Sequence, residues 1–596
     1  MDDQNKNIIL ATALSFVVIL VWFLLFPPPE APAEDPNAPV AAAEVTSPSA
    51  PAPVAAATDP AQATPAETAP DAPRVAIETP RVKGSISLLG GRIDQLALKD
   101  YNETQEPESD IVTVLSPIGS ENAYYALFGW AAGAGLSPED VPGPNTLWSI
   151  AGTGALTPDT PITLNWDNGK GQVFHRVISI DADYMFAIEQ SVTNTGANAV
   201  SLAPYGILAR HGEPANAKKF FILHEGTVGM ADGELTETSY SDLEDLDFNA
   251  REGARADVTQ VAETGWIGFT DHYWMSTLIP SSGTPFKSAV KYDERRDIFQ
   301  AEAVQPTQTI APGQTGTART QLFSGAKEWE AIRAYEKAGV AKFVDSIDWG
   351  WFFFLTKPIF QALHFLHGFI GNMGWSIIAL TIVIKAVVFP LAYKSYASMA
   401  KMKELQPKME ELKQNAGDDR AKLQQAMMEL YKKEKVNPAS GCLPILIQIP
   451  IFFSLYKVIF VTLELRHAPW LGWITDLSAP DPSSILNLFG LLPYATPGPD
   501  SVFAIVSLGI LPILLGVSMW LQQKLNPAPT DATQAMIFAW MPWVFMFMLG
   551  SFASGLVLYW ITNNTITFTQ QYLIMRSHGY KPDVFGNIKN SFKRKK

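Results

Sequence analysis

Cysteine is almost absent from this chain of 596 residues, whose only thiol is Cys442. A single cysteine excludes an intramolecular disulfide, so any part that faces an oxidising compartment must be stable through its own core. Cationic residues are scarce before Trp349, where Asp and Glu outnumber Lys and Arg roughly two to one. This acidic half is not expected to bind nucleic acid, because a phosphate backbone requires a cationic face. No GxxxxGK[ST] string occurs, so no nucleotide-driven step is predicted.

Long apolar runs are present, and the first is Ile8–Phe26. It has no charge and is long enough to cross a hydrocarbon layer of ~30 Å as a helix. The rival interpretation is a cleaved signal peptide, but the chain starts with Asp2, Asp3 and only Lys6 rather than a basic segment. We predict an uncleaved anchor over residues 1–26. The Pro- and Ala-rich residues 27–80 cannot bury enough apolar area to fold and are predicted to form a tether.

Short segments of alternating polarity fill residues 81–324 and are separated by turn sequences. They predict an antiparallel all-β sandwich, which together with a terminal helix over Lys327–Phe343 makes a domain of residues 81–345. Strand segments include Ser85–Leu88, Val177–Ile180, Phe186–Val192 and Trp266–Phe269, and turns include Gly90-Gly91, Asp167–Gly169, Asn194–Gly196 and Pro312-Gly313.

The rest of the chain alternates apolar and basic stretches. The aromatic run Trp349–Ile370 is interrupted by Lys357-Pro358 and two histidines, so residues 346–371 are predicted to form an amphipathic helix on the membrane surface. Residues 372–576 are predicted to form an α-helical membrane core of five helices, followed by a basic cytoplasmic tail over residues 577–596. The predicted spans are Asn372–Tyr393, Gly441–Leu463, Val502–Gln523, Ala535–Phe552 and Gly555–Met575.

The positions of lysine and arginine orient these spans. The segment from Lys394 to Lys435 holds ten Lys or Arg residues, and the chain ends in a further basic run. Both basic stretches are predicted to be cytoplasmic by the positive-inside rule. Counting spans then places both termini in the cytoplasm and the domain of residues 81–345 in the periplasm.

The basic loop of residues 394–436 has apolar residues at helical spacing. Gly417 and the acidic residues after it predict a helix stop and a new N-cap, so we predict a cytoplasmic helical hairpin with Pro407 at a kink. The alternative is a solvated loop that only fixes topology. Methionine is pliable and suits varied apolar partners. The residues predicted to recruit substrate are Met399, Met402, Met409, Met427 and Met428.

Lys385 lies inside the predicted span Asn372–Tyr393, ten residues from Trp375 and eight from Tyr393, and so roughly 12–15 Å from each of these two aromatic residues along the helix. An unpaired cation at this depth costs at least ~2.5 kcal/mol, and no other apolar span contains an evident carboxylate to pair with it. We predict a water-filled polar pocket around Lys385, lined by Thr381, Gln448 and Asn563. The alternative is that Lys385 snorkels and that these groups make ordinary interhelical hydrogen bonds.

Six strings of the chain are long and specific: Tyr396–Met402, Leu430–Lys432, Glu434–Pro438, Gly441–Phe452, Ser554–Trp560 and Pro312–Gly316. With these strings the chain resembles the YidC-type insertases of the Oxa/YidC/Alb family, and the resemblance covers nearly the whole length. It implies a five-helix core with a hydrophilic groove open to the cytoplasm and to lipid. It also implies a periplasmic β-supersandwich and an extra N-terminal helix, as in Gram-negative members.

The chain departs from this family at two places. The groove cation of the family is usually an arginine, and Lys385 aligns with it, which keeps the charge but replaces a planar fork by a point charge. The outer loop around Asn487–Asp500 is longer than usual, and the sequence does not define its role.

The resemblance implies insertion and folding of integral membrane proteins in the bacterial inner membrane, alone or with the Sec translocon. An acidic tail would enter the groove at Lys385, while the apolar segment slides past Ile449 and Tyr559–Trp560 into lipid. Expected partners are nascent membrane proteins, the lipid bilayer, the Sec translocon with its accessory subunits, and the ribosome through basic loops and tail, but no DNA. The basic tail equally suits binding to anionic lipid, or a role in the positive-inside rule alone. Neither enzyme activity nor a cofactor is expected.

Three other classes of protein were weighed. A solute transporter or channel would be expected to show inverted repeats or several intramembrane ion-pair residues, whereas the sequence shows no repeat and no evident carboxylate partner for Lys385 in the apolar spans. A docking scaffold would not explain Lys385. A sugar or peptide cleft of unknown use in the outer domain stays open. A carbohydrate-processing enzyme there would need acid–base groups, and no spacing marks a catalytic pair. Its candidate residues are His175, His211, His224 and His272.

Overall fold

The computed structural model describes residues 72–579 except 153, 216, 218–222, 418, 435, 437–442, 495–500, 502–505 and 527–531. The predicted anchor, most of the predicted tether, and the chain after residue 579 lie outside the described residues. The tether boundary at residue 80 is wrong. Strand β1 (Arg74–Glu78) already alternates exposed and buried residues and pairs with β2, because its apolar residues face the core.

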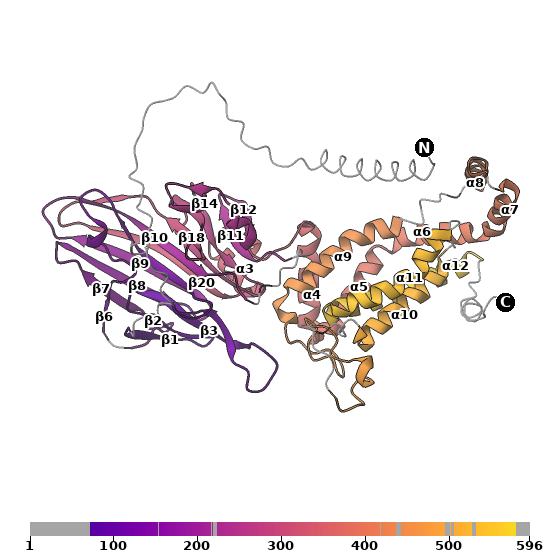
Figure 1. Ribbon diagram of the computed structural model, residues 1–596, viewed down its shortest axis with the longest axis horizontal. Helices are drawn as coiled ribbons and strands as arrows, with labels where there is room; N and C mark the ends of the chain where they lie inside the picture. Colours follow the sequence, from indigo (N-terminus) through magenta and orange to yellow (C-terminus); the bar gives the residue numbers. More distant parts are fainter. Residues whose placement is uncertain are drawn as a thin grey trace, which may run out of the picture. The chain divides into compact units, whose positions relative to one another are not determined.

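Two antiparallel sheets form the all-β domain, as predicted (Figure 1). Among the described residues, the order of the first sheet is β1, β2 (Val82–Ser87), β3 (Arg92–Asn102), β5 (Tyr124–Ala132), β10 (Val200–His211), β18 (Ile298–Val304), β17 (Phe286–Asp293), β14 (Ala254–Val261) and β13 (Phe248–Asn249), with β4 (Ile111–Leu115) beside β3 and β19 (Gln308–Ile310) beside β10. The second sheet runs β12 (Glu234–Ser239), β11 (Gly226–Ala231), β15 (Gly265–Thr270), β16 (Trp274–Pro280), β20 (Thr315–Ala326), β9 (Met185–Asn194), β8 (Gln172–Ile180), β7 (Ile162–Asp167) and β6 (Ser149–Ala151).

Alternating polarity explains the strands. In β8 every second side chain is buried, including Phe174 and Ile178, which belong to the apolar core of the domain. The turn between β7 and β8 forms where the sequence predicts it: Asp167 accepts a hydrogen bond from the backbone N–H of Gly169 at 2.8 Å, and Gly169 has a positive φ of 67°. Arg176 is also buried in β8, and its guanidinium donates to the carbonyl of Gly91 at 2.9 Å.

Lys327 follows β20 and is buried. Its ammonium donates to the Thr270 hydroxyl at 3.0 Å and to the Asp271 carbonyl at 2.6 Å. Burial disfavours the charged form and lowers the pKa of Lys327 from 10.5 to about 8.

This shift predicts a rise of stability in alkaline solution. Between the folded pKa of about 8 and the ordinary value of 10.5, the unfolded chain binds more protons than the folded chain. The free energy of unfolding should therefore rise across this window, by on the order of 3 kcal/mol. Denaturant unfolding of the full chain, followed by fluorescence at several pH values, measures it. Lys327→Met should lack the rise, and an identical pH profile in the variant would contradict the assignment.

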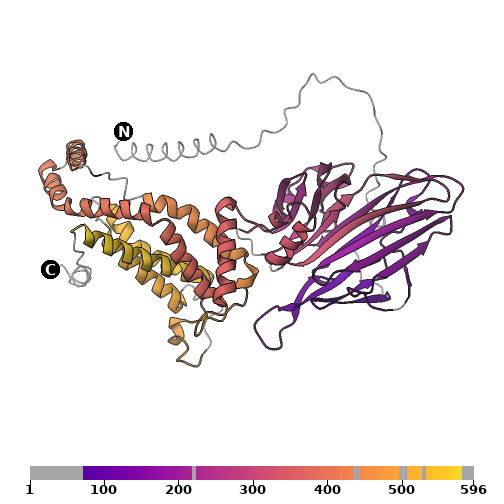
Figure 2. The same ribbon diagram turned by 180° about the vertical axis from the view of Figure 1, so that it is seen from behind.

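The helices follow the sandwich strands in the sequence, apart from α2 (Tyr240–Glu244) and the short η1 (Pro138–Asp140) inside the domain. They are α3 (Trp329–Lys337), η2 (Phe343–Ser346), α4 (Phe353–Ile370), α5 (Met373–Val387), α6 (Phe389–Glu404), α7 (Gln406–Ala416), α8 (Arg420–Lys433), α9 (Leu443–Val461), η4 (Leu463–Leu465), η5 (Ile485–Asn487), α10 (Ile510–Leu525), α11 (Ala532–Met548), η7 (Leu549–Ser551) and α12 (Ser554–Ser577). Both views show α5, α10, α11 and α12 bundled side by side (Figure 2).

The predicted span Asn372–Tyr393 is not one helix. The chain bends by 68° between α5 and α6. Pro390 explains the break, since it has no N–H to donate to the preceding turn. Among the described residues, only this bent pair has the length and hydropathy to cross a membrane, and no single helix does. The predicted start of the span Val502–Gln523 lies outside the described residues, and within them helix α10 begins at Ile510, after Gly509.

The predicted cytoplasmic hairpin consists of α7 and α8, which pack against each other. Gly417 has a positive φ of 55° after the last turn of α7, and Asp419 caps α8 by accepting the N–H of Lys422 at 3.0 Å. The first part of the predicted loop, from residue 394, belongs instead to α6, which continues from the bend to Glu404.

Candidate functional site

Three helices place their side chains around Lys385 near the C-terminal end of α5. Lys385 is only 7% exposed. Its ammonium donates to Oε1 of Gln448 on α9 at 3.2 Å and to the hydroxyl of Thr567 on α12 at 2.9 Å. The amide group of Gln448 in turn donates to the Tyr559 hydroxyl at 2.7 Å. Lys385, Gln448 and Tyr559, which were predicted separately, thus form one hydrogen-bonded cluster.

A buried polar stripe on α12 extends this cluster. Asn563, Thr567 and Gln571 are spaced four residues apart and therefore share one face of the helix. Thr567 also forms a side-chain hydrogen bond with Tyr396 of α6. The sequence interpretation included Asn563 but missed Thr567 and Gln571, although their spacing from Asn563 is the signal that identifies them.

The partners of Lys385 are neutral. Within the described part of the chain, no carboxylate forms an ion pair with Lys385, so Gln448 and Thr567 supply dipoles and leave the charge uncompensated. An ammonium has three N–H donors, and these two acceptors occupy two. Nearby on the α12 stripe, Oδ1 of Asn563 is buried and has no hydrogen-bond partner among the described residues. Buried acceptors of this kind usually contact water.

Two predicted groove residues have other surroundings than expected. The Thr381 hydroxyl donates to the carbonyl of Ile377 at 2.7 Å, one turn earlier in the same helix, so it is not a partner of Lys385. Tyr559 is 1% exposed, and its hydroxyl accepts a hydrogen bond from the Gln448 amide. Trp560 is half-buried, with its ring centroid 4.9 Å from that of Phe452.

The methionines differ in exposure. Met399 was predicted to recruit substrate, but it is buried against Ala392, Tyr396 and Ile574, because it lies on α6 and not on the hairpin. Met428 on α8 is exposed. Met402, Met409 and Met427 are half-buried, and the Tyr431 hydroxyl contacts the Met409 sulfur at 3.8 Å. Met428 is therefore the most accessible of the five.

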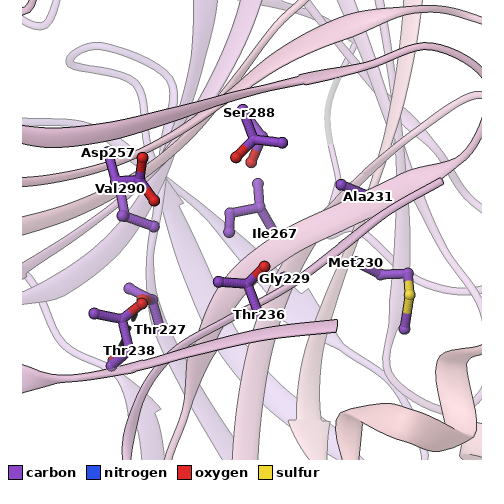
Figure 3. Close-up of a pocket in the computed structure, with 11 residues that line it drawn as sticks. Thr227, Gly229, Met230, Ala231, Thr236, Thr238, Asp257, Ile267, Ser288 and Val290 are labelled. Atoms are coloured by element: carbon purple, nitrogen blue, oxygen red, sulfur yellow. Dashed lines mark hydrogen bonds between the residues drawn. The ribbon is translucent and has the colours of Figure 1, made fainter. Parts of the chain in front are cut away.

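The sandwich contains a cleft between its two sheets, lined by threonine and serine hydroxyls from β11, β12 and β17 and by Asp257 of β14 (Figure 3). The cavity volume of this cleft is ≈ 30 Å³. Three of the histidines considered for a carbohydrate-processing enzyme have hydrogen-bond partners other than carboxylates. His175 contacts the side-chain amide oxygen of Asn165, and His224 and His272 contact backbone carbonyls.

The fold and the site together define a class, a protein with an all-β domain followed by an apolar helical core that contains a buried polar cluster. Residues 74–362 match the family described as YidC periplasmic domain, and residues 365–581 match the family described as 60Kd inner membrane protein. The chain belongs to the YidC family of membrane protein insertases.

Relatives of similar length support this assignment. The membrane protein insertase YidC of Ruegeria pomeroyi is 66% identical, with 100% of this chain and 99% of the relative covered. That of Roseobacter denitrificans is 65% identical with the same coverage. A crystal structure of an active YidC insertase is similar at 16% identity over 85% of this chain and 94% of that chain, with a TM-score of 0.34, and carries no part of the assignment. The chain is thus an insertase of membrane proteins in the inner membrane, with a periplasmic domain.

Proposed function

We propose that the Lys385 cluster is the polar centre of a groove that opens to the cytoplasm and receives the hydrophilic end of a nascent membrane protein. The observation that carries this proposal is a buried ammonium group whose protein partners, Gln448 and Thr567, are both neutral. A carboxylate partner would cancel the charge. Neutral dipoles stabilise the ammonium and leave its attraction for an incoming anion intact.

The acidic tail of a substrate interacts with Lys385 without losing all its water. The third N–H of the ammonium and the unpartnered Oδ1 of Asn563 are positions where water binds. A wet groove lowers the desolvation cost of both the lysine and the substrate carboxylate. The membrane potential adds to the driving force on a charged tail that crosses toward the periplasm.

The apolar part of the substrate passes along α9. Leu446, Ile449 and Phe453 are exposed and are spaced three and four residues apart, so they form one apolar face of this helix. Gln448 lies beside this face in the sequence and reaches Lys385. Transfer of about 20 apolar residues into the hydrocarbon layer supplies the work, so we propose no enzymatic reaction and no nucleotide.

The basic segments define the orientation and the further partners that we propose. The α7–α8 hairpin, with its Lys and Arg residues, faces the cytoplasm, and so do both termini. The hairpin meets nascent chains first, and basic residues there suit contact with ribosomal RNA. The Sec translocon is a further proposed partner. Helix α4, with exposed Phe365 and Phe369, lies on the membrane surface.

Photocrosslinking to a stalled nascent chain tests the path. A photoreactive amino acid at Ile449 should crosslink to the apolar segment of the substrate, because this position lies on the proposed path. The matched control is Val544, which is also exposed but lies on α11. Equal crosslinking at both positions, or none at Ile449, would contradict the path along α9.

The hairpin makes a separate prediction. Met428→Glu should lower the initial rate of insertion about two- to fivefold, since an apolar contact worth on the order of 1 kcal/mol is lost. Met428→Leu keeps the apolar surface and should behave like the parent protein. Rates are measured with inverted vesicles and a radiolabelled nascent substrate. An unchanged rate in Met428→Glu would remove Met428 from substrate capture.

A further inference from the structure

The segment between α9 and α10 contains an uncharged loop with a large apolar surface. From Pro482 to Tyr494, here called the apolar loop, the sequence has no Asp, Glu, Lys, Arg or His. Leu491 is 83% exposed. The exposed large side chains of the loop are Ile485, Leu488, Phe489, Leu491, Leu492 and Tyr494. Several large apolar side chains exposed within one short loop mark a site of contact with another molecule or with a membrane.

The loop is held in shape by its own hydrogen bonds. The backbone N–H of Phe489 donates to the carbonyl of Ser484 at 2.7 Å, and the Tyr494 hydroxyl donates to the carbonyl of Leu486. Leu488 and Phe489 both have positive φ values, 51° and 58°, which residues other than glycine rarely adopt. The loop therefore keeps a strained backbone that directs apolar side chains outward.

The base of the loop is fixed to the start of α10. The backbone N–H of Ile485 donates to the carbonyl of Leu508 at 2.8 Å. Asp481, just before the loop, accepts the N–H of Leu511 in the first turn of α10 at 2.8 Å. The same carboxylate accepts the indole N–H of Trp473 at 3.0 Å. These hydrogen bonds hold the base of the apolar loop, the first turn of α10 and Trp473 close together, so all three lie at the same depth relative to the membrane.

Tryptophans indicate what that depth is. Helix α4 follows the periplasmic domain, and two residues separate its end from the start of α5. The first turn of α5 therefore lies on the periplasmic side. Trp375 in this first turn contacts Trp470 of the α9–α10 segment, with ring centroids 5.7 Å apart. Trp375 and Trp473 are both exposed, and exposed tryptophans gather at the membrane–water interface. The base of the apolar loop therefore lies at headgroup level.

We propose that the apolar loop inserts into the periplasmic leaflet of the bilayer and anchors the periplasmic end of α10 in lipid. This inference goes beyond the insertase activity, because it concerns lipid contact away from the Lys385 cluster. Lipid is favoured over a protein partner because the loop is uncharged and starts at the depth marked by the tryptophans, whereas protein interfaces carry a polar rim.

The full-length protein with a fluorescent label tests this inference. Leu491→Cys is made in a Cys442→Ser background, labelled with an environment-sensitive fluorophore, and reconstituted into vesicles of phosphatidylcholine and phosphatidylglycerol. Two quenchers are compared, a lipid with a nitroxide near the top of its acyl chain and aqueous iodide. The matched control is Phe248→Cys, an exposed apolar position on β13 of the periplasmic domain.

Insertion predicts that the lipid nitroxide quenches the label at position 491 several-fold more than at position 248, and that iodide shows the reverse order. Quenching by iodide to the same extent at both positions would show that the loop lies in water. Protection from both quenchers would show that protein covers the loop. Either of the last two results overturns the proposal.

Discussion

Insertion of substrates with acidic tails should fall roughly 10- to 100-fold when Lys385 is replaced by alanine. A hydrogen bond to a charged group contributes about 1.5–3 kcal/mol, and loss of that amount in the rate-limiting step corresponds to this range of rates. Gln448 and Thr567 cannot replace the lost attraction, because both are neutral. The measurement is the initial rate of insertion into reconstituted vesicles under an imposed membrane potential.

The controls separate charge from folding. Lys385→Arg retains the positive charge and should insert these substrates at nearly the parent rate, even though a planar guanidinium replaces the compact ammonium group. Substrates with neutral tails should insert normally in Lys385→Ala. Normal insertion of acidic-tailed substrates by Lys385→Ala would remove the charge-attraction role, and loss of both substrate types together with loss of the folded protein would indicate a structural role only.

The largest effect on stability is expected in the periplasmic domain, at Lys291. Its ammonium is 3% exposed and bridges Glu252 at 2.6 Å and Glu302 at 2.5 Å. Lys291→Met would leave Glu302 as a buried carboxylate without a cation, which costs about 3–5 kcal/mol. The domain in the full-length protein should therefore unfold at a temperature roughly 10 °C lower.

Lys287 provides a matched comparison on the same strand. It also pairs with Glu252, at 2.7 Å, but its side chain is more exposed. Lys287→Met leaves Glu252 paired with Lys291 and should cost about 1 kcal/mol or less. Near-equal midpoints for the two variants, measured by thermal unfolding with circular dichroism, would show that burial of the pair does not determine its contribution.

The sequence predicted elements well and their contacts less well. Alternating polarity identified strands such as β8, and the residue types around Gly417 identified the hairpin, because both signals are local in the chain. The bend after Val387 was missed even though Pro390 is visible in the sequence, since a proline can be accommodated in a membrane helix when neighbours satisfy the freed backbone group.

The composition of the polar cluster could be predicted only in part. Lys385 and Gln448 were recognised because a polar group inside an apolar run is conspicuous. Thr567 was missed although it lies four residues after Asn563, and its contact with Lys385 depends in addition on how α12 packs against α5 and α9. The hydrogen-bond partners of Thr381 and Tyr559 could not be predicted for the same reason: residue type does not show whether a hydroxyl binds its own helix or a neighbouring helix.

The most direct test of a water-filled groove is the reactivity of a thiol at position 385. Lys385→Cys in a Cys442→Ser background is exposed to a charged, membrane-impermeant thiosulfonate in inverted and in right-side-out vesicles. Ile382→Cys, on the exposed side of α5, is the control. A groove open to the cytoplasm predicts rapid reaction of Cys at position 385 in inverted vesicles only, with the control unreactive. No reaction at position 385 from either side, while the denatured protein reacts, would contradict it.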